Sequence, residues 1–145
     1  MDPMDSTTNT PSGAELARAW FDHSPFVRLL GLRLQEMGDG EARVELPYRE
    51  ELATAGDVVH GGAIGTLADT AAALAAWSSH DPARGTRWGT VGLTLSFLAA
   101  GRGEALVAHA RVTRRGSAIC FCRVEVAGAG GSPVAEALVT YRLGA

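Results

Sequence analysis

One segment constrains the fold more than any other: residues 63–77 are almost continuously apolar and rich in alanine. A helix of this composition presents apolar side chains on nearly all its faces, so other elements must surround it. The segment is too short to span a membrane, and the chain has no run of about 18 or more apolar residues. We therefore expect the rest of the 145-residue chain to pack around this helix.

The flanking segments alternate between apolar and polar residues in the manner of strands. Two strands are predicted before the helix and four after it: residues 32–35, 41–46, 91–97, 106–112, 120–126 and 135–143. A short helix starting at an S-x-x-E capping box, a second helical turn and an irregular loop are predicted at residues 12–23, 26–30 and 49–57. The class is therefore α+β, with an antiparallel six-stranded sheet wrapped around a central buried helix. Such a sheet leaves edges uncovered, so we expect an oligomer.

Composition excludes several classes of function. The net charge is −3 and all 13 basic residues are arginine, which disfavours nucleic-acid binding and excludes Schiff-base chemistry through a lysine. Cys120 and Cys122 are interpreted as small core residues, and no residue spacing suggests a metal site. Residues 1–12 carry no signal-peptide pattern and are predicted to be a disordered tail before a single domain at 13–145, in a cytoplasmic protein.

Asp69 is the one charged residue between Gly61 and Ser79. A buried carboxylate without a partner is destabilising by several kcal/mol, so its presence in an apolar helix needs a reason. It could face a solvated slot or pair with an arginine. It could also be a pocket carboxylate that acts as a general base or a nucleophile.

His60, Gly61 and Gly62 stand where the apolar helix begins. The first N–H groups of a helix have no intrahelical acceptor, and glycines let a ligand approach them, which favours an oxyanion or anion site. The glycines could instead relieve a tight turn, with His60 capping a carbonyl. At 1.5 Å per residue, Asp69 lies about 10–12 Å along the axis from this helix start. A second, antiparallel copy of the helix would close that gap, which favours a site shared between subunits.

Three motifs carry a family resemblance: V-H-G-G-A-I-G-T-L-A-D-T-A, T-V-G-L-T-L-S-F-L and R-R-G-S-A-I-C-F. Over residues 25–143 the chain resembles the hotdog-fold acyl-CoA thioesterases of the PaaI-like group. The resemblance implies a hotdog fold, a homodimer often paired into a tetramer, and hydrolysis of acyl-CoA thioesters. It implies no cofactor, because coenzyme A is part of the substrate.

The resemblance also implies roles for single residues. The Gly61 N–H would be the oxyanion hole, with His60 and Gly62 shaping its turn. Asp69 would activate water or attack the thioester carbonyl. Thr90 matches a position where related enzymes carry a water-positioning hydroxyl, although a threonine at a strand start is equally typical of a structural residue.

Two further places bear on substrate binding. Thr54 stands where the family often has Asn or Gln, so a hydroxyl replaces an amide and we expect altered water positioning or substrate choice. The basic turn of Arg114, Arg115, Gly116 and Ser117 resembles the family's CoA-contacting turn and offers N–H groups to phosphate, although such turns are often simply solvated.

Rival functions remain open from the sequence alone. A hotdog dehydratase lacks support, because its characteristic His and Glu on the central helix are missing. A non-catalytic acyl-CoA-binding sensor would keep the pocket without turnover, and a purely structural oligomer would leave Asp69 unexplained. The acyl group stays open, although Trp77, Trp88 and Phe97 could line an aromatic-acyl pocket.

Overall fold

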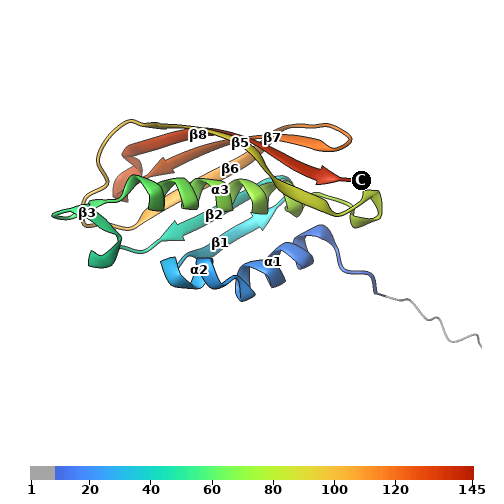
Figure 1. Ribbon diagram of the computed structural model, residues 1–145, viewed down its shortest axis with the longest axis horizontal. Coiled ribbons are helices and arrows are strands. Elements are labelled where there is room, and N and C mark those ends of the chain that lie inside the picture. The colour runs from blue at the N-terminus through green and yellow to red at the C-terminus, as the bar shows by residue number, and fades with distance from the viewer. Residues whose placement is uncertain (1–8) are drawn as a thin grey trace, which may run out of the picture.

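The computed structural model describes residues 9–145, and its centre is helix α3, Gly61–Ser78 (Figure 1). This helix confirms the prediction of a buried helix at residues 63–77. Eleven of its residues are buried, and Leu67, Ala71 and Leu74 have no exposed surface at all. Burial of a helix on several faces needs small side chains, and the run of alanines supplies them.

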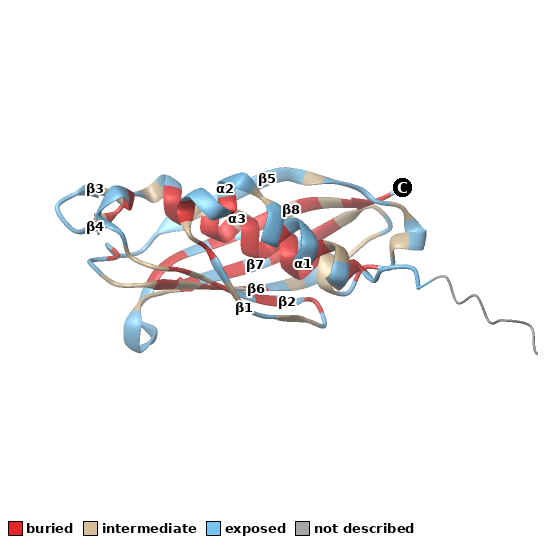
Figure 2. Ribbon diagram, turned by 90° about the horizontal axis from the view of Figure 1, so that it is seen from below, coloured by how far each residue is buried: buried red, intermediate tan, exposed pale blue. Residues whose placement is uncertain are grey.

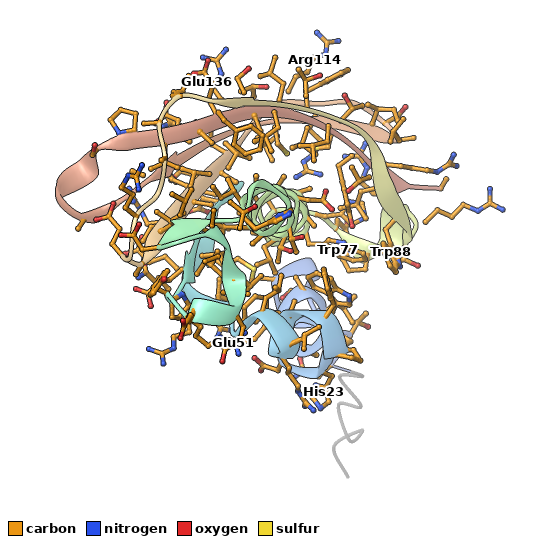
Figure 3. The ribbon with its side chains drawn as sticks, turned by 60° about the vertical axis from the view of Figure 1, so that its left-hand side comes forward. His23, Glu51, Trp77, Trp88, Arg114 and Glu136 are labelled. Carbon is orange, nitrogen blue, oxygen red and sulfur yellow. The ribbon has the colours of Figure 1, made fainter. Side chains whose placement is uncertain are left out.

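A six-stranded antiparallel sheet wraps around α3 in the order β1-β2-β6-β7-β8-β5 (Figures 1 and 3). The strands are β1 (Arg33–Gly38), β2 (Glu41–Leu46), β5 (Arg87–Phe97), β6 (Leu106–Arg115), β7 (Ile119–Ala127) and β8 (Pro133–Gly144). Asp39 and Gly40 have φ values of 52° and 78° and form the tight turn between β1 and β2. The predicted α+β class, with six strands around a central helix, is confirmed.

The core lies between the concave face of the sheet and α3 (Figure 2). Burial alternates along β7, where Cys120, Cys122 and Val124 are buried while the residues between them are exposed. The Cys122 Sγ lies 3.8 Å from the carbonyl oxygen of Ala72 in α3. The interpretation of both cysteines as small core residues is confirmed.

Two short helices lie on the side of α3 away from the C-terminal strands of the sheet: α1 (Gly13–His23) and α2 (Pro25–Leu30) (Figure 3). The Ser12 Oγ accepts a hydrogen bond from the Glu15 N–H at 3.1 Å, so the predicted N-cap of the first helix is confirmed. Gly13 packs against the carbonyl groups at the end of α3, where a Cβ atom would have no room. The first helix is therefore held against the C-terminal end of α3.

The prediction of an irregular loop at residues 49–57 is wrong. A 3₁₀ turn (Glu50–Leu52) is followed by a small hairpin of β3 (Ala53–Ala55) and β4 (Val58–Val59). Gly56, with φ of 56°, allows the tight reversal between the two strands. Strands of two or three residues are too short for alternation to reveal them in the sequence.

Within residues 9–145, strand β5 is an edge strand that pairs with β8 alone. Its side chains are mostly exposed, among them Trp88, Val91 and Phe97, whose exposed fractions are 60%, 64% and 55%. A long, exposed, apolar edge strand is a template for pairing with another chain. The edge expected from the sequence is therefore present, and it is apolar.

Of the predicted N-terminal tail, residues 1–8 lie outside the described residues, and residues 9–12 precede α1 without regular structure. Within residues 9–145, no helix combines the length and the apolarity that a membrane crossing requires.

Candidate active site

The structure brings Asp69 and Thr90 together. Asp69 projects from the middle of α3, and Thr90 lies near the start of the edge strand β5. The Thr90 hydroxyl donates a hydrogen bond of 2.6 Å to the Asp69 Oδ1. A bond this short to a carboxylate is charge-assisted, and it fixes the orientation of the carboxyl group. In the part of the chain that the structure describes, the Asp69 Oδ2 accepts no hydrogen bond, so this oxygen is available to a ligand or a water molecule.

A cavity of about 510 Å³ opens beside this pair. One wall is a single face of α3 whose residues repeat at helical spacing: Gly62, Gly65, Thr66, Asp69, Thr70 and Ala73. Side chains of α1, α2, β5 and β8 complete the lining, and most of them are apolar. A mostly apolar slot with a single carboxylate, held in place by a hydroxyl, fits a ligand that is largely apolar and carries one reacting polar group.

His60 caps the start of α3. Its Nδ1 accepts a hydrogen bond of 2.8 Å from the Gly62 N–H, so the imidazole is unprotonated at this nitrogen. A Cβ atom on Gly62 would lie 3.0 Å from that ring nitrogen. The second glycine of the motif therefore makes room for the cap, and the ring satisfies an N–H donor rather than a carbonyl.

The Gly61 N–H has no acceptor among the residues that the structure describes. It is the first N–H of α3, where the positive end of the helix dipole adds to its ability to hold an anion. A Cβ atom on Gly61 would lie 3.0 Å from the Phe97 Cζ, so the glycine allows this ring to pack against the helix start. Phe97 thus lies at the N-terminal end of α3.

Within one chain, the helix start and the carboxylate stay apart. Gly61 and Asp69 are eight residues apart on the same helix, which corresponds to about 12 Å along its axis. Thr54 is exposed on β3 and does not line the cavity beside Asp69. The predicted oxyanion donor and the predicted base therefore do not meet on one bound atom in a single chain.

The basic turn lies at the opposite end of α3. The Arg115 Nη2 donates to the Ala76 carbonyl oxygen at 2.7 Å and to the Ser79 Oγ at 2.8 Å, and so caps the C-terminus of the helix. Arg114 points away from α3 on the outer side of the sheet (Figure 3). Gly116 is held by a hydrogen bond from its N–H to the Ile119 carbonyl, and Ser117 is exposed. One guanidinium of the turn thus stabilises the helix, while the other faces outward.

The cavity also contains an aromatic group that the sequence reasoning did not select. Tyr141 on β8 is 3% exposed and lies opposite Thr90 in the register of β5 and β8. Trp77 and Trp88 lie on the same side of α3 (Figure 3). The alternation of Val139, Tyr141 and Leu143 predicts that this tyrosine faces inward, but only the pairing of β8 with β5 brings it next to Thr90.

Across residues 9–145, no three His, Cys, Asp or Glu side chains gather in a way that could hold a metal ion.

Comparison with known proteins agrees with this geometry. The profile of the Thioesterase superfamily matches residues 56–135, more than half of the chain. The medium/long-chain acyl-CoA thioesterase YigI of Escherichia coli is 30% identical over 137 residues, which cover 84% of this chain and 87% of YigI.

Two solved structures are also similar. The PaaI protein of E. coli, from the phenylacetic acid degradation operon, has a TM-score of 0.79 and 25% identity over 90% of this chain and 93% of that one. A conserved protein of Pseudomonas aeruginosa has a TM-score of 0.77 and 31% identity, covering 83% and 94% of the two chains.

The fold and the polar pair in an apolar slot define a hotdog-fold hydrolase. The chain belongs to the thioesterase superfamily, within its PaaI-like group. The predicted family and the prediction of a thioester-hydrolysing enzyme are confirmed.

Proposed function

We propose that this enzyme hydrolyses acyl-CoA thioesters to a free acid and coenzyme A, with Asp69 as the catalytic carboxylate. The observation that carries the proposal is the 2.6 Å hydrogen bond from Thr90 to Asp69 beside a mostly apolar cavity. Relatives named as acyl-CoA thioesterases support coenzyme A as the thiol. We further propose a cytoplasmic enzyme that needs no cofactor besides its substrate.

The Thr90 hydroxyl donates its hydrogen bond to the Oδ1 of Asp69, so the Oδ2 is the oxygen that takes part in the reaction. That oxygen either takes a proton from a water molecule that attacks the thioester carbonyl or attacks the carbonyl itself. In both routes the carbonyl oxygen becomes an oxyanion, the C–S bond then breaks, and the sulfur leaves as a thiolate. In the general-base route the thiolate takes up the proton that Asp69 accepted from water, and in the covalent route it takes up a proton from the water of the second step. Thiolate is a good leaving group, so a strong general acid is not required. In the covalent route, water hydrolyses the acyl-aspartyl intermediate in a second step.

The oxyanion needs a donor that Asp69's own subunit does not supply, and we assign this role to Gly61 of a second subunit. Two α3 helices packed antiparallel across a two-fold axis would bring the Gly61 N–H of one subunit to Asp69 of the other. The apolar edge of β5 supports such pairing, because Thr90 lies on this strand and Phe97 of the same strand contacts Gly61. The proposed assembly is a homodimer that can pair into a tetramer.

The same symmetry gives the basic turn a role. The turn of residues 114–117 lies at the C-terminal end of α3, which would face the N-terminal end of the partner's helix. Arg114 and Ser117 would then meet the coenzyme A phosphates that emerge from the partner's slot, while the bond from the Gly116 N–H to Ile119 holds the turn. Arg115 acts here by fixing the turn to α3, and Thr54 acts on water or substrate at the helix start.

The first experiment measures the release of coenzyme A with a thiol reagent over aryl, short-chain and long-chain acyl-CoAs. Asp69→Ala should lose turnover on every substrate while it still binds acyl-CoA. The matched control is Asp57→Ala, which removes an exposed carboxylate paired with Arg102 at 3.3 Å and should retain turnover. Binding without turnover in the wild type would overturn the proposal in favour of an acyl-CoA sensor.

A second experiment tests the shared site. Asp69→Ala and Gly61→Pro each disable one half of it, and the two variants are mixed under conditions that exchange subunits. Random exchange gives a mixed dimer with one intact site, so about a quarter of the wild-type rate should return. A mixture as inactive as its components would show that both groups act within one subunit.

A further inference from the structure

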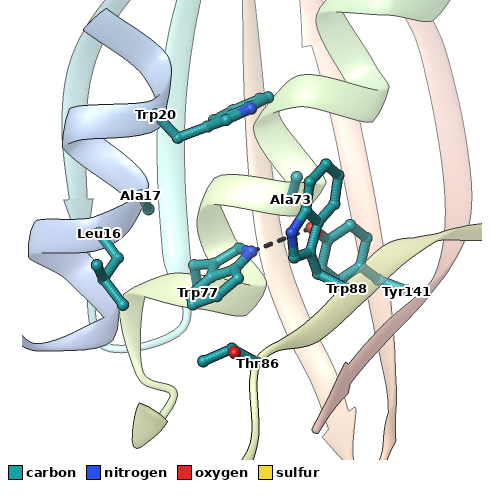
Figure 4. A pocket seen from close by; sticks show the side chains of 8 residues that line it. All are labelled: Leu16, Ala17, Trp20, Ala73, Trp77, Thr86, Trp88 and Tyr141. Carbon is teal, nitrogen blue, oxygen red and sulfur yellow. Dashed lines mark hydrogen bonds between the residues drawn. The ribbon is translucent and has the colours of Figure 1, made fainter. Parts of the chain in front are cut away.

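A second cavity of about 310 Å³ continues the slot beside Asp69 toward the C-terminal end of α3. Trp20, Ala73, Trp88 and Tyr141 line both cavities, so the two share a wall. Trp77 lines the second cavity only. Three indoles and one phenol dominate the lining of this cavity (Figure 4). This combination of flat aromatic walls is typical of a pocket that holds a compact apolar group.

The position of Tyr141 relates this pocket to the catalytic pair. Thr90 and Tyr141 are direct neighbours across β5 and β8, which places their Cβ atoms about 4.5–5.5 Å apart. Trp77 follows Asp69 by eight residues, or about 12 Å along α3. A path that starts at Asp69 and follows α3 therefore passes the Tyr141 ring and reaches Trp77.

The far end of this path carries one unused hydrogen-bond donor. The Trp77 Nε1 donates to the Tyr141 hydroxyl oxygen at 3.1 Å (Figure 4). Among the residues that the structure describes, the hydroxyl hydrogen of Tyr141 has no acceptor. Burial raises the pKa of Tyr141 to about 12, so the hydroxyl keeps this hydrogen at neutral pH. A buried donor without an acceptor is unfavourable, and an oxygen atom of a ligand would satisfy it.

Building on the proposed thioesterase function, we propose that Tyr141 determines specificity by donating a hydrogen bond to an oxygen atom at the far end of a compact acyl group. The tryptophans hold the apolar body of that group, and Trp77 orients the Tyr141 hydroxyl. The oxygen belongs to a ring hydroxyl of an aromatic acyl group or to an oxo group of a short aliphatic one. The two sources offer the same acceptor, and the aromatic lining favours the ring.

The test compares matched substrate pairs that differ by one oxygen. The aromatic pair is 3-phenylpropanoyl-CoA and its 4-hydroxy derivative, and the aliphatic pair is hexanoyl-CoA and 5-oxohexanoyl-CoA. Wild type should prefer the oxygenated member of at least one pair by about tenfold or more in kcat/KM. Tyr141→Phe should lose about tenfold of that preference. Tyr48→Phe, which removes the same atom from the chain's other tyrosine, should keep it.

Each ratio is measured on one protein preparation, so a partly unfolded variant affects both members of a pair equally. Equal ratios in wild type and Tyr141→Phe would overturn the assignment. So would a wild type without preference for oxygen in either pair, a result that needs no variant. Hydrolysis of both members at similar rates thus refutes only the role of Tyr141, whereas no hydrolysis of any thioester refutes the proposed function.

Discussion

Replacing Gly61 by proline would remove one N–H group and leave the start of α3 intact. Proline fits the first position of a helix, because the N–H there has no intrahelical acceptor and the fixed φ suits the helix. His60 has φ of −61° and ψ of 134°, an extended conformation that a residue before proline readily adopts. The variant therefore tests the N–H rather than the stability of the helix.

The expected loss of kcat can be assigned to the N–H group because proline and alanine both add a Cβ atom at this position. Either residue adds a Cβ atom about 3.0 Å from the Phe97 Cζ, so the ring must shift in both variants. Gly61→Ala keeps the N–H and is the matched control, with an expected loss of a few-fold. Loss of an oxyanion donor lowers kcat by about 10²- to 10³-fold, or about 3–4 kcal/mol. The kcat of Gly61→Pro should therefore be about 10²- to 10³-fold lower than the kcat of Gly61→Ala.

The assay is release of the coenzyme A thiol, with kcat and KM measured for both variants and thermal unfolding measured in parallel. We expect the difference to fall on kcat, because the donor acts on charge that develops only in the transition state. Equal kcat values in the proline and alanine variants, with both proteins folded, would refute the role of the Gly61 N–H.

Further predictions concern Thr90, Tyr141 and the two arginines of the basic turn. Thr90→Val removes a hydrogen bond to a carboxylate while keeping the shape of the side chain, so kcat should fall by about tenfold or more. Thr90→Ser keeps the hydroxyl and should retain most of the wild-type kcat. Equal kcat values for the valine and serine variants would contradict the role of the hydroxyl. Burial raises the pKa of Tyr141 to about 12, while the phenol of the unfolded chain ionises near pH 10. The contribution of Tyr141 to the free energy of unfolding is therefore fully present below about pH 10. It falls by about 2–3 kcal/mol in total as the pH rises to about 12. Denaturant unfolding across that range checks the slope, which should flatten in Tyr141→Phe. Arg115→Met removes two hydrogen bonds at the end of α3 and should lower the free energy of unfolding by about 1–3 kcal/mol. Arg114→Met should leave it within about 0.5 kcal/mol and raise the KM for acyl-CoA; the reverse pattern would contradict both assignments.

The local elements followed from the sequence because each has a local cause. The run of alanines between Gly61 and Ser78 can only form a helix that other elements surround. The Ser12 cap and the alternation along β7 depend on neighbours within a few residues. Asp69 stood out for the same reason, because one charge in an apolar helix is visible without any structure.

The side chains that surround Asp69 could not be predicted from local sequence patterns. Its bond to Thr90 joins residues 21 apart in sequence, and Tyr141 reaches the same slot only through the register of β5 and β8. Arg115 resembled a ligand-binding residue in the sequence, yet the packing of the β6–β7 turn places its guanidinium on the last carbonyl groups of α3. The sequence by itself determined the helix, the six strands of the main sheet and the carboxylate, since propensity and periodicity are local. Only the tertiary structure decided which side chains face that carboxylate, because strand register and helix packing join residues that no local pattern relates.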